Sequence, residues 1–320
     1  MDLVDTLRKK IVVLEDGDYI PGLKAVLLHI ETAFRHLSRG QESDDDTAFT
    51  DAIYRTNQAF EGSVKEAYRV LAGQDPAKKR PYDIENYLEQ NNIFRSRVLS
   101  QLTIYRTEWR NPSAHDYKLD FDESEAFLAI VSVSAFACLL LDQIAERLAY
   151  TRSQAEAEAK KAQLAASLAQ SMNADLLARV TDLLTQFCAI HMPPVAASSG
   201  KATESQVIGA LHGFLASAAP ELNVQTDALL DAGRHFRADL LVTRGGDRLI
   251  IELKRRLMRQ NYANVVAQVE HYLLISGVKN AVLLFLPDAP GEMEQLDSTV
   301  NGIDARLVIL SPTGSNPSVK

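Results

Sequence analysis

The stretch RADLLVTRGGDRLIIELK, residues 237–254, decides the fold of the second half of the chain. Two apolar, β-branched-rich runs flank Gly245 and Gly246. Such a pair is a strong signal for a two-residue hairpin turn in which both central positions have positive φ. With this turn Arg244 faces Asp247, so we expect an antiparallel β-hairpin.

The hairpin register brings two carboxylates and a lysine together. Counting back from the turn places Asp239 directly opposite Glu252, and cross-strand neighbours have Cβ atoms about 4.5–5.5 Å apart. Lys254 shares their face because strand side chains alternate. Two carboxylates this close repel unless a proton or a metal lies between them, and the set suits Mg²⁺ with water and phosphate oxygens. The alternative is an exposed hairpin with a charged solvent face.

The pattern D-(x)12-E-x-K after an apolar Leu-Ile-Ile resembles the core motif of the PD-(D/E)xK nuclease superfamily. Ala238 stands where the motif has proline, a variation that the superfamily tolerates. Glu204 begins a helical stretch, where such nucleases often place a further metal-binding Glu. In the helix expected after the hairpin, Gln268 and Tyr272 are one turn apart and match the Q-x-x-x-Y element of RecB-like members.

This resemblance covers about residues 200–320 and implies a restriction-endonuclease-like αβββαβ domain that hydrolyses phosphodiester bonds with Mg²⁺ or Mn²⁺. It implies a metal site formed by Glu204, Asp239 and Glu252. Lys254 would assist the attacking water, and Gln268 and Tyr272 would support the site. The runs NAVLLFLP and ARLVILSP near the C-terminus are typical of buried strands that complete a mixed sheet.

Local positive charge accompanies the predicted metal site. The formal net charge of −8 gives no general attraction to nucleic acid, so phosphate contacts have to be local. A cluster of basic residues follows the hairpin, and another arginine is the first residue of the hairpin. We expect nucleic-acid contacts from Arg237, Arg255, Arg256 and Arg259. The alternative is a solvated hairpin and helix start.

Residues 1–150 carry helical signals, and we expect an all-α antiparallel bundle. Residues 22–37 and 48–73 have apolar positions at three- and four-residue spacing. The polar segment 39–46 between them is expected to be a loop.

Two more helices are expected before residue 150. The third runs from about Asp83 to Arg110 and is ended by Pro112, because proline cannot continue the backbone ladder. The fourth starts near Asp122, whose spacing to Glu125 resembles a capping box. Its apolar run, residues 126–141, falls short of the ~18 residues that suggest a membrane span, so we interpret it as a core helix.

The turn expected between the third and fourth helices holds Arg110 and His115. Both can be structural, with the arginine near the terminal carbonyls of a helix and the histidine bonded to the backbone. Alternatively, His115 moves protons on or off a ribose 2′-hydroxyl while the Arg110 guanidinium holds the charged phosphorane, which is metal-free RNA cleavage.

Arg110-(x)4-His115, with Asn111 after the arginine and Tyr117 after the histidine, resembles the R-x4-H-x-Y form of HEPN toxins. The resemblance covers about residues 20–150. Many HEPN domains are RNases whose active site combines the Arg and His of two chains, which implies a homodimer. Others are inactive and serve as dimerising or sensing modules.

The segment 151–199 connects the two regions. Its apolar positions form a narrow stripe of Leu164, Leu168, Met172, Leu176, Val180 and Leu183. The stripe suits a helix that pairs with another helix or with its twin in a dimer, or one that packs on its own bundle. Pro193 and Pro194 then begin an interdomain linker. We therefore expect domains at 1–150 and 200–320, joined by 151–199.

The compartment follows from two further features. Cys138 and Cys188 lack metal-like spacing and are expected to be buried free thiols in a reducing cytoplasm. The opening MDLVDTLRKK is charged and lacks an apolar core, so we expect no signal peptide and no membrane association.

The main hypothesis is a cytoplasmic, Mg²⁺-dependent endonuclease, with DNA favoured over RNA, joined to a HEPN-like dimerising domain. Family analogy suggests a defence effector against phage or plasmids, with an antitoxin or defence protein as partner. One alternative is a metal-independent HEPN RNase toxin whose C-terminal domain only binds nucleic acid. The other is a non-catalytic, dimeric nucleic-acid-binding protein.

Overall fold

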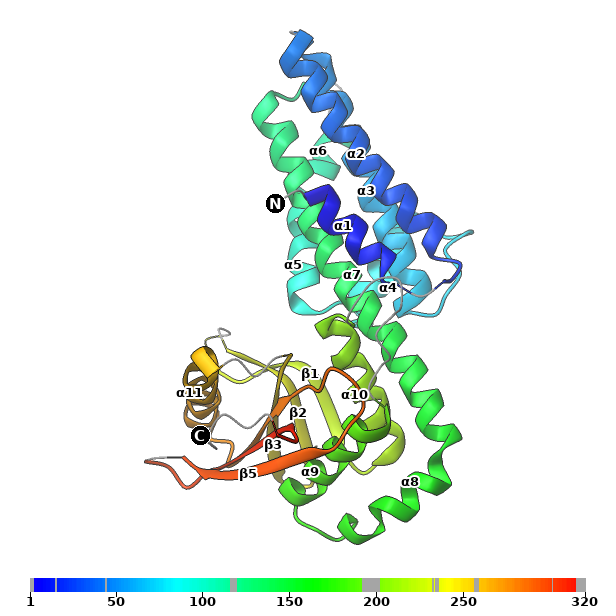
Figure 1. The fold of residues 1–320 in the computed structure, drawn as a ribbon. Coiled ribbons are helices and arrows are strands. Elements are labelled where there is room, and N and C mark those ends of the chain that lie inside the picture. Colours follow the sequence, from blue (N-terminus) through cyan, green and yellow to red (C-terminus); the bar gives the residue numbers. More distant parts are fainter. Residues whose placement is uncertain are drawn as a thin grey trace. The chain divides into compact units, whose positions relative to one another are not determined.

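The computed structural model describes residues 3–14, 16–43, 45–115, 120–191, 202–231, 233, 236–255, 259–300 and 302–314 of the chain. The chain divides into two compact units, Met1–Leu148 and Ala149–Lys320. The first is helical, and the second contains a mixed β-sheet with helices (Figure 1). The helical and mixed α/β characters of the two regions are as predicted.

The helical unit is built from α1 to α6 and the first part of α7. The bounds are α1 Leu3–Val12, α2 Ile20–Ser43, α3 Thr47–Leu71, α4 Pro81–Gln90, α5 Ser96–Tyr105, a π-helical turn Arg106–Arg110, α6 Asn111–His115 and α7 Glu123–Ala159. Aromatic rings fill the middle of its core. Phe60 stacks on Tyr105 at 4.8 Å between ring centroids and lies 5.3 Å from Phe136.

The loop predicted for residues 39–46 begins later than predicted, because α2 continues to Ser43; α3 begins at Thr47. Gly40 lies in the last part of α2, where the helix packs against Phe49 of α3. A Cβ there would lie 2.4 Å from a ring carbon of Phe49, so glycine lets the two helices approach closely. The polar residues around Gly40 occupy the exposed side of the same helix.

The single third helix predicted for residues 83–110 is also wrong. The chain leaves the helix after Gln90, and Asn92 has a positive φ of 52°. Asparagine tolerates this left-handed conformation better than most residues, so it ends α4 without a glycine. A second helix, α5, begins at Ser96.

Pro112 does not end the helical path as predicted, because Asn111–His115 forms the short helix α6. Proline is tolerated in a first helical turn, where its missing N–H is not needed. The Ser113 hydroxyl donates hydrogen bonds to the carbonyls of Trp109 and Arg110, at 2.7 and 3.1 Å.

The start of α7 is as predicted. The Asp122 carboxylate accepts from the Glu125 N–H at 2.8 Å, and the Glu125 carboxylate accepts from the Asp122 N–H at 2.9 Å, which is a reciprocal capping box. Among the described residues, α7 alone is long and apolar enough for a membrane span, and half of its most apolar window is buried inside the protein. Ile130, Val133 and Phe136 are fully buried, as in a core helix.

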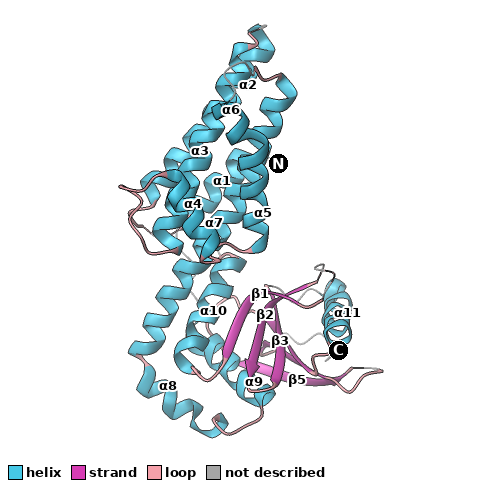
Figure 2. Cartoon of the chain, turned by 180° about the vertical axis from the view of Figure 1, so that it is seen from behind, coloured by secondary structure: helices cyan, strands magenta, loops and turns pink. Residues whose placement is uncertain are grey.

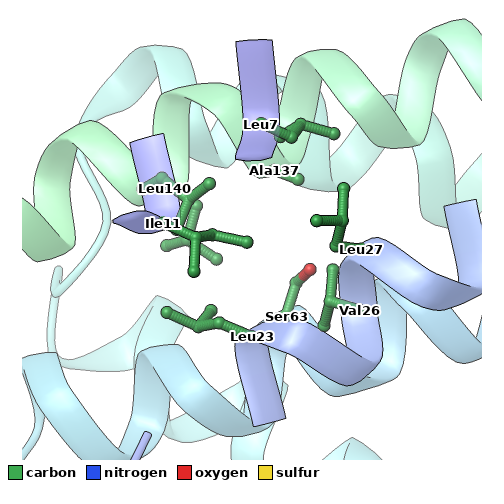
Figure 3. A pocket seen from close by; sticks show the side chains of 9 residues that line it. Leu7, Ile11, Leu23, Val26, Leu27, Ser63, Ala137 and Leu140 are labelled. Carbon is green, nitrogen blue, oxygen red and sulfur yellow. The ribbon is translucent and has the colours of Figure 1, made fainter. Parts of the chain in front are cut away.

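A small cavity lies between α1, α2, α3 and α7. Figure 3 shows Leu7 and Ile11 on one side and Leu23 and Val26 on the other. Its volume of about 10 Å³ is at the lower limit for one water molecule. The one hydroxyl in its lining, that of Ser63, donates to the Ala59 carbonyl at 2.8 Å. This space is a packing gap in the core.

The second unit contains a six-stranded mixed sheet in the order β1-β2-β3-β4-β6-β5. The strands are β1 Asn223–Leu229, β2 Arg237–Arg244, β3 Asp247–Lys254, β4 Asn280–Phe285, β5 Met293–Thr299 and β6 Arg306–Pro312. Strand β3 is antiparallel to β2 and parallel to β4. Helix α11, Arg259–Ser276, makes the crossover that this parallel pair requires. The two predicted C-terminal strands are confirmed as β4 and β6.

Helices cover both faces of the sheet. Helix α11 packs on one face, with Val269 and Leu273 in a core that includes Ile250 and Leu283. Helices α9, Leu176–Gln186, and α10, Glu204–Ala218, pack on the other (Figure 2).

The separate connecting helix predicted for 151–190 is wrong. This part of the chain forms the end of α7, then α8 Lys161–Leu168, α9 and a π-helical turn Phe187–His191. The predicted stripe packs into the core of the sheet unit, with the exception of Met172, which is 62% exposed. Asp175 explains one break, because its carboxylate caps α9 by accepting from the Ala178 N–H at 2.8 Å. The predicted linker at Pro193 and Pro194 lies outside the described residues.

Both cysteines are free thiols, as expected. Cys188 is buried and Cys138 is partly buried. Burial raises the pKa of both thiols, that of Cys188 to about 12, so neither is an activated nucleophile.

Gly213 on α10 marks the closest backbone approach in the sheet unit. A Cβ at this position would lie 2.2 Å from the carbonyl oxygen of Tyr150 at the end of α7. Alanine in a helix interior is ordinarily up to about 1 kcal/mol better than glycine. Here the clash is with backbone, which has no rotamer to move away.

We therefore expect Gly213→Ala to lower the free energy of unfolding by about 1–3 kcal/mol, as overpacking does. Gly246→Ala is the matched control, because no atom lies within 4 Å of its Cβ position. Denaturant unfolding of both variants measures the effect. A Gly213→Ala protein as stable as the control would contradict the close approach.

Candidate active site

The β2–β3 hairpin has the predicted register, with Arg244 paired to Asp247. The turn differs from the prediction, because only Gly245 has a positive φ, 61°. The regular pairing ends at Leu240 and Ile251, one pair before Asp239 and Glu252. The predicted pairing of Asp239 with Glu252 is therefore wrong: an ideal hairpin would place them opposite each other, but the ladder stops one pair earlier.

The Asp239 side chain takes the place of the missing ladder partner. Its Oδ2 accepts a hydrogen bond from the Leu253 N–H at 2.7 Å. This bond holds the carboxylate against β3 at the end of the regular pairing. Backbone distortion on the other side of β2 accompanies it, because Asp227 on β1 has a positive φ of 50°.

Asp227 and Arg237 lock this distortion. Arg237 Nη1 donates to the Asp227 carbonyl at 2.8 Å and to its Oδ2 at 3.1 Å. A non-glycine residue in this conformation costs energy and persists where its surroundings hold it. Arg237, expected to contact nucleic acid, is thus bonded to β1. No sequence signal identified Asp227.

Glu252 is the centre of the side-chain network. It is 4% exposed. Its Oε1 accepts from Lys254 Nζ at 2.7 Å and from Gln268 Nε2 at 3.3 Å. Gln268 Nε2 also donates to Tyr272 Oη at 2.6 Å. The structure therefore brings four of the predicted residues, from β3 and α11, into one hydrogen-bonded chain.

One atom of this network lacks a partner. Glu252 Oε2 is buried and has no hydrogen-bond partner among the described residues. Most buried polar atoms in native proteins are hydrogen-bonded, so this oxygen has room for one more partner, which a water, an ion, a ligand or a proton can supply.

The two carboxylates disfavour each other's ionisation. Burial, followed by the charge of Glu252, raises the pKa of Asp239 to about 7, although the Leu253 N–H opposes the shift. Burial also raises the pKa of Glu252, and its hydrogen bond with Lys254 opposes that shift. The pair holds a proton near neutral pH more readily than ordinary carboxyls do.

Lys254 stays cationic in this setting. Burial alone would lower its pKa, but the hydrogen bond and charge of Glu252, with Asp239 and Glu204, outweigh burial and raise it. A protonated lysine donates hydrogen bonds and stabilises negative charge.

Glu204 is the first residue of α10, and its side chain is exposed. Thr203 and Gln206 form a capping box that fixes this helix start. The charge of Glu204 raises the pKa of Asp239 and of Glu252. Glu204 thus acts on the pair through its charge. Across the described ranges, no group of three His, Cys, Asp or Glu side chains is arranged to hold a metal.

The Asp239–Glu252 pair fits a divalent cation on two observations. The buried Glu252 Oε2 offers an unused acceptor, and the raised pKa values show that the site favours added positive charge. Hard oxygen ligands of this kind suit Mg²⁺ or Mn²⁺.

Of the predicted basic cluster, Arg255 is exposed directly after β3. Arg256 lies outside the described residues. Arg259 begins α11, but its side chain is also outside them.

In the helical unit, Arg110 is the last residue of the π-helical turn Arg106–Arg110, in keeping with its predicted place at a helix end. Its Nη1 donates to Asn111 Oδ1 at 3.0 Å. Burial raises the pKa of Glu85 on α4, and the charges of Arg110 and Arg106 partly offset this. His115 ends α6, but its side chain lies outside the described part of the chain, as does Tyr117.

No family model, curated protein or solved structure matches this chain.

The raised pKa of Asp239 predicts how stability depends on pH. Between its ordinary value of 3.8 and about 7, the folded protein holds a proton that the unfolded chain releases. Stability from this group is therefore full at low pH and is lost as the pH rises from about 4 to 7. Asp239→Asn keeps an acceptor for the Leu253 N–H and removes the charge.

In EDTA at pH 8 we expect Asp239→Asn to exceed the wild type in free energy of unfolding by on the order of 2–4 kcal/mol, with the difference vanishing near pH 4. Asp297→Asn, at an exposed position on β5, should show the same pH dependence of the free energy of unfolding as the wild type. Urea unfolding across this pH range is the measurement. Parallel curves for Asp239→Asn and the wild type would argue against the buried, repelling pair.

Proposed function

We propose that the C-terminal unit is a Mg²⁺- or Mn²⁺-dependent nuclease of the PD-(D/E)xK type, and that it hydrolyses phosphodiester bonds, with DNA as the favoured substrate. The order α10-β1-β2-β3-α11-β4 supports this, because it has the αβββαβ sequence of that fold. The observation that carries the proposal is the buried Glu252 Oε2 beside Asp239, for which the described residues supply no hydrogen-bond partner.

In this proposal Asp239 and Glu252 hold the metal, and Glu204 adds negative charge that favours it. The bound metal would lower the pKa of the attacking water and neutralise charge on the phosphate. The Leu253 N–H keeps Asp239 in place at 2.7 Å, so the carboxylate is oriented before substrate arrives.

Lys254 supports the reaction as a cation. With its pKa raised, it can donate a hydrogen bond that orients water or stabilises the developing charge on the phosphate. Gln268 links Glu252 to Tyr272 and so fixes the Glu252 carboxylate from the α11 side. Gln268 and Tyr272 are positioning residues.

The helical unit is proposed to dimerise the protein, as the HEPN resemblance implies. By the same analogy the protein acts in the cytoplasm as a defence effector, with an antitoxin or defence protein as its partner. A second candidate function, RNA cleavage without metal, is favoured by the π-helical turn Arg106–Arg110. Such turns are frequent at functional sites.

Lys254→Ala tests the first proposal. We expect it to lower Mg²⁺-dependent cleavage by at least about 100-fold, because a charge-stabilising group is lost. Lys279→Ala removes an exposed lysine elsewhere in the same unit and should cleave normally. Plasmid DNA, single-stranded DNA and RNA would each be incubated with Mg²⁺, Mn²⁺ or EDTA.

A second readout does not depend on turnover. Mg²⁺ should raise the Tm of the wild type by binding the folded state and should not raise that of Asp239→Asn. Undiminished cleavage by Lys254→Ala, together with equal Mg²⁺ effects on both proteins, would refute the metal-site proposal.

The alternative predicts a different pattern. RNA cleavage that persists in EDTA and disappears in His115→Ala would assign the activity to the helical unit. Asn91→Ala, at an exposed helix end in that unit, is its control. Nucleic-acid binding without cleavage under any condition would instead favour a non-catalytic binding protein.

A further inference from the structure

An aromatic ledge lies at the start of β2, formed by Phe236, His271 and Tyr272. The Phe236 ring meets His271 edge to face at 5.0 Å between centroids and Tyr272 at 6.2 Å. Phe236 is 38% exposed, and His271 is exposed on the surface of α11. Tyr272 is buried beneath them at 7% exposure.

The ledge is built on an anchored backbone. The Phe236 N–H donates to Asp231 Oδ1 at 2.9 Å, and its carbonyl accepts from the Leu230 N–H at 2.9 Å. Both bonds fix the chain where it enters β2. An apolar ring kept in solvent on a fixed backbone costs hydration free energy that a buried position would avoid. The exposed face of the ring is available to a ligand.

The ledge adjoins the carboxylate site. Phe236 lies directly before β2 and three residues before Asp239 in that strand. Tyr272 connects to Glu252 through Gln268, by hydrogen bonds of 2.6 and 3.3 Å. The cationic Lys254 follows Glu252 on β3, and the exposed Arg255 comes directly after that strand. Aromatic surface, cations and the candidate phosphate-cleaving groups therefore occur together.

Resting on the proposed nuclease activity, we propose that Phe236 and His271 form a stacking platform for an unpaired base, so that the site takes single-stranded nucleic acid. Every base has a π-face, so aromatic side chains bind single strands with little sequence preference. The bases inside a duplex are already stacked on both sides. A strand with a free base can stack on Phe236 while a neighbouring phosphate reaches Lys254 and the carboxylates.

Binding without turnover tests the platform separately from catalysis. The probes are a short single-stranded DNA, a single-stranded RNA of the same sequence, and a blunt DNA duplex. Each single strand carries one 2-aminopurine, and all measurements are made in EDTA. We expect tighter binding of the single strands than of the duplex, with fluorescence quenching from stacking. The DNA and RNA arms show which single strand is preferred.

Substitutions at Phe236 then separate stacking from apolar contact. Phe236→Ala should weaken single-strand binding by about 5- to 100-fold, the range for loss of one stacked base. Phe236→Leu keeps apolar bulk without a π-face and should lose most of the same affinity, whereas Phe236→Trp should retain it. Met172→Ala, which removes another exposed apolar side chain of this unit, should leave binding unchanged.

Lys254→Ala separates the two proposals, because it should lose cleavage, while a saturating concentration of single strand should still give the 2-aminopurine quenching even though the lost phosphate contact weakens the affinity. If the wild type fails to cleave with any metal but Phe236→Ala still weakens binding, the nuclease proposal falls and the platform stands. Wild-type single-strand affinity in Phe236→Ala or Phe236→Leu overturns the platform. So does a Phe236→Ala protein whose only change is its oligomeric state, since the ledge would then bind a second copy.

Discussion

The C-terminal unit depends on one electrostatic constraint, the burial of two carboxylates within range of each other. Asp239 and Glu252 each lose solvation, which raises both pKa values, and the charge of Glu252 raises the pKa of Asp239 further. Donors from three places offset the cost: the Leu253 N–H, Lys254 and Gln268. The hairpin, the α11 crossover and the end of the β2–β3 ladder are arranged so that these donors reach the pair.

Local signals in the sequence predicted much of the fold. The hairpin register, the Asp122–Glu125 capping box and the strands β4 and β6 each depend on residues close in the chain. Predictions failed where tertiary contacts decide. In the sequence, Gly40 belongs to a polar segment typical of a loop, and only the structure shows that it packs against Phe49. Likewise, the sequence of the apolar stripe Leu164–Leu183 does not indicate that it packs into the core of the sheet unit. Strand β5 escaped prediction because its side chains alternate between partly buried and exposed and include several polar residues.

The sequence predicted which residues form the candidate site, but it did not predict the hydrogen bonds that join them. Strand alternation and helical spacing bring Glu252, Lys254, Gln268 and Tyr272 to one face, and the structure joins them by hydrogen bonds. The acceptor role of Asp239 toward a backbone N–H depends on where the ladder stops, which no spacing rule gives. The same holds for the ledge at Phe236, whose exposure depends on the fold around it.

The kink at Asp227 has a consequence for association between copies of the chain. Strands β1 and β5 are the two edges of the sheet. A straight, apolar edge strand invites another strand to pair with it, but the positive φ of Asp227 interrupts β1, and β5 exposes Gln295, Asp297 and Thr299. Neither edge is a good template for strand addition. Self-association through a continuous intermolecular sheet is therefore disfavoured.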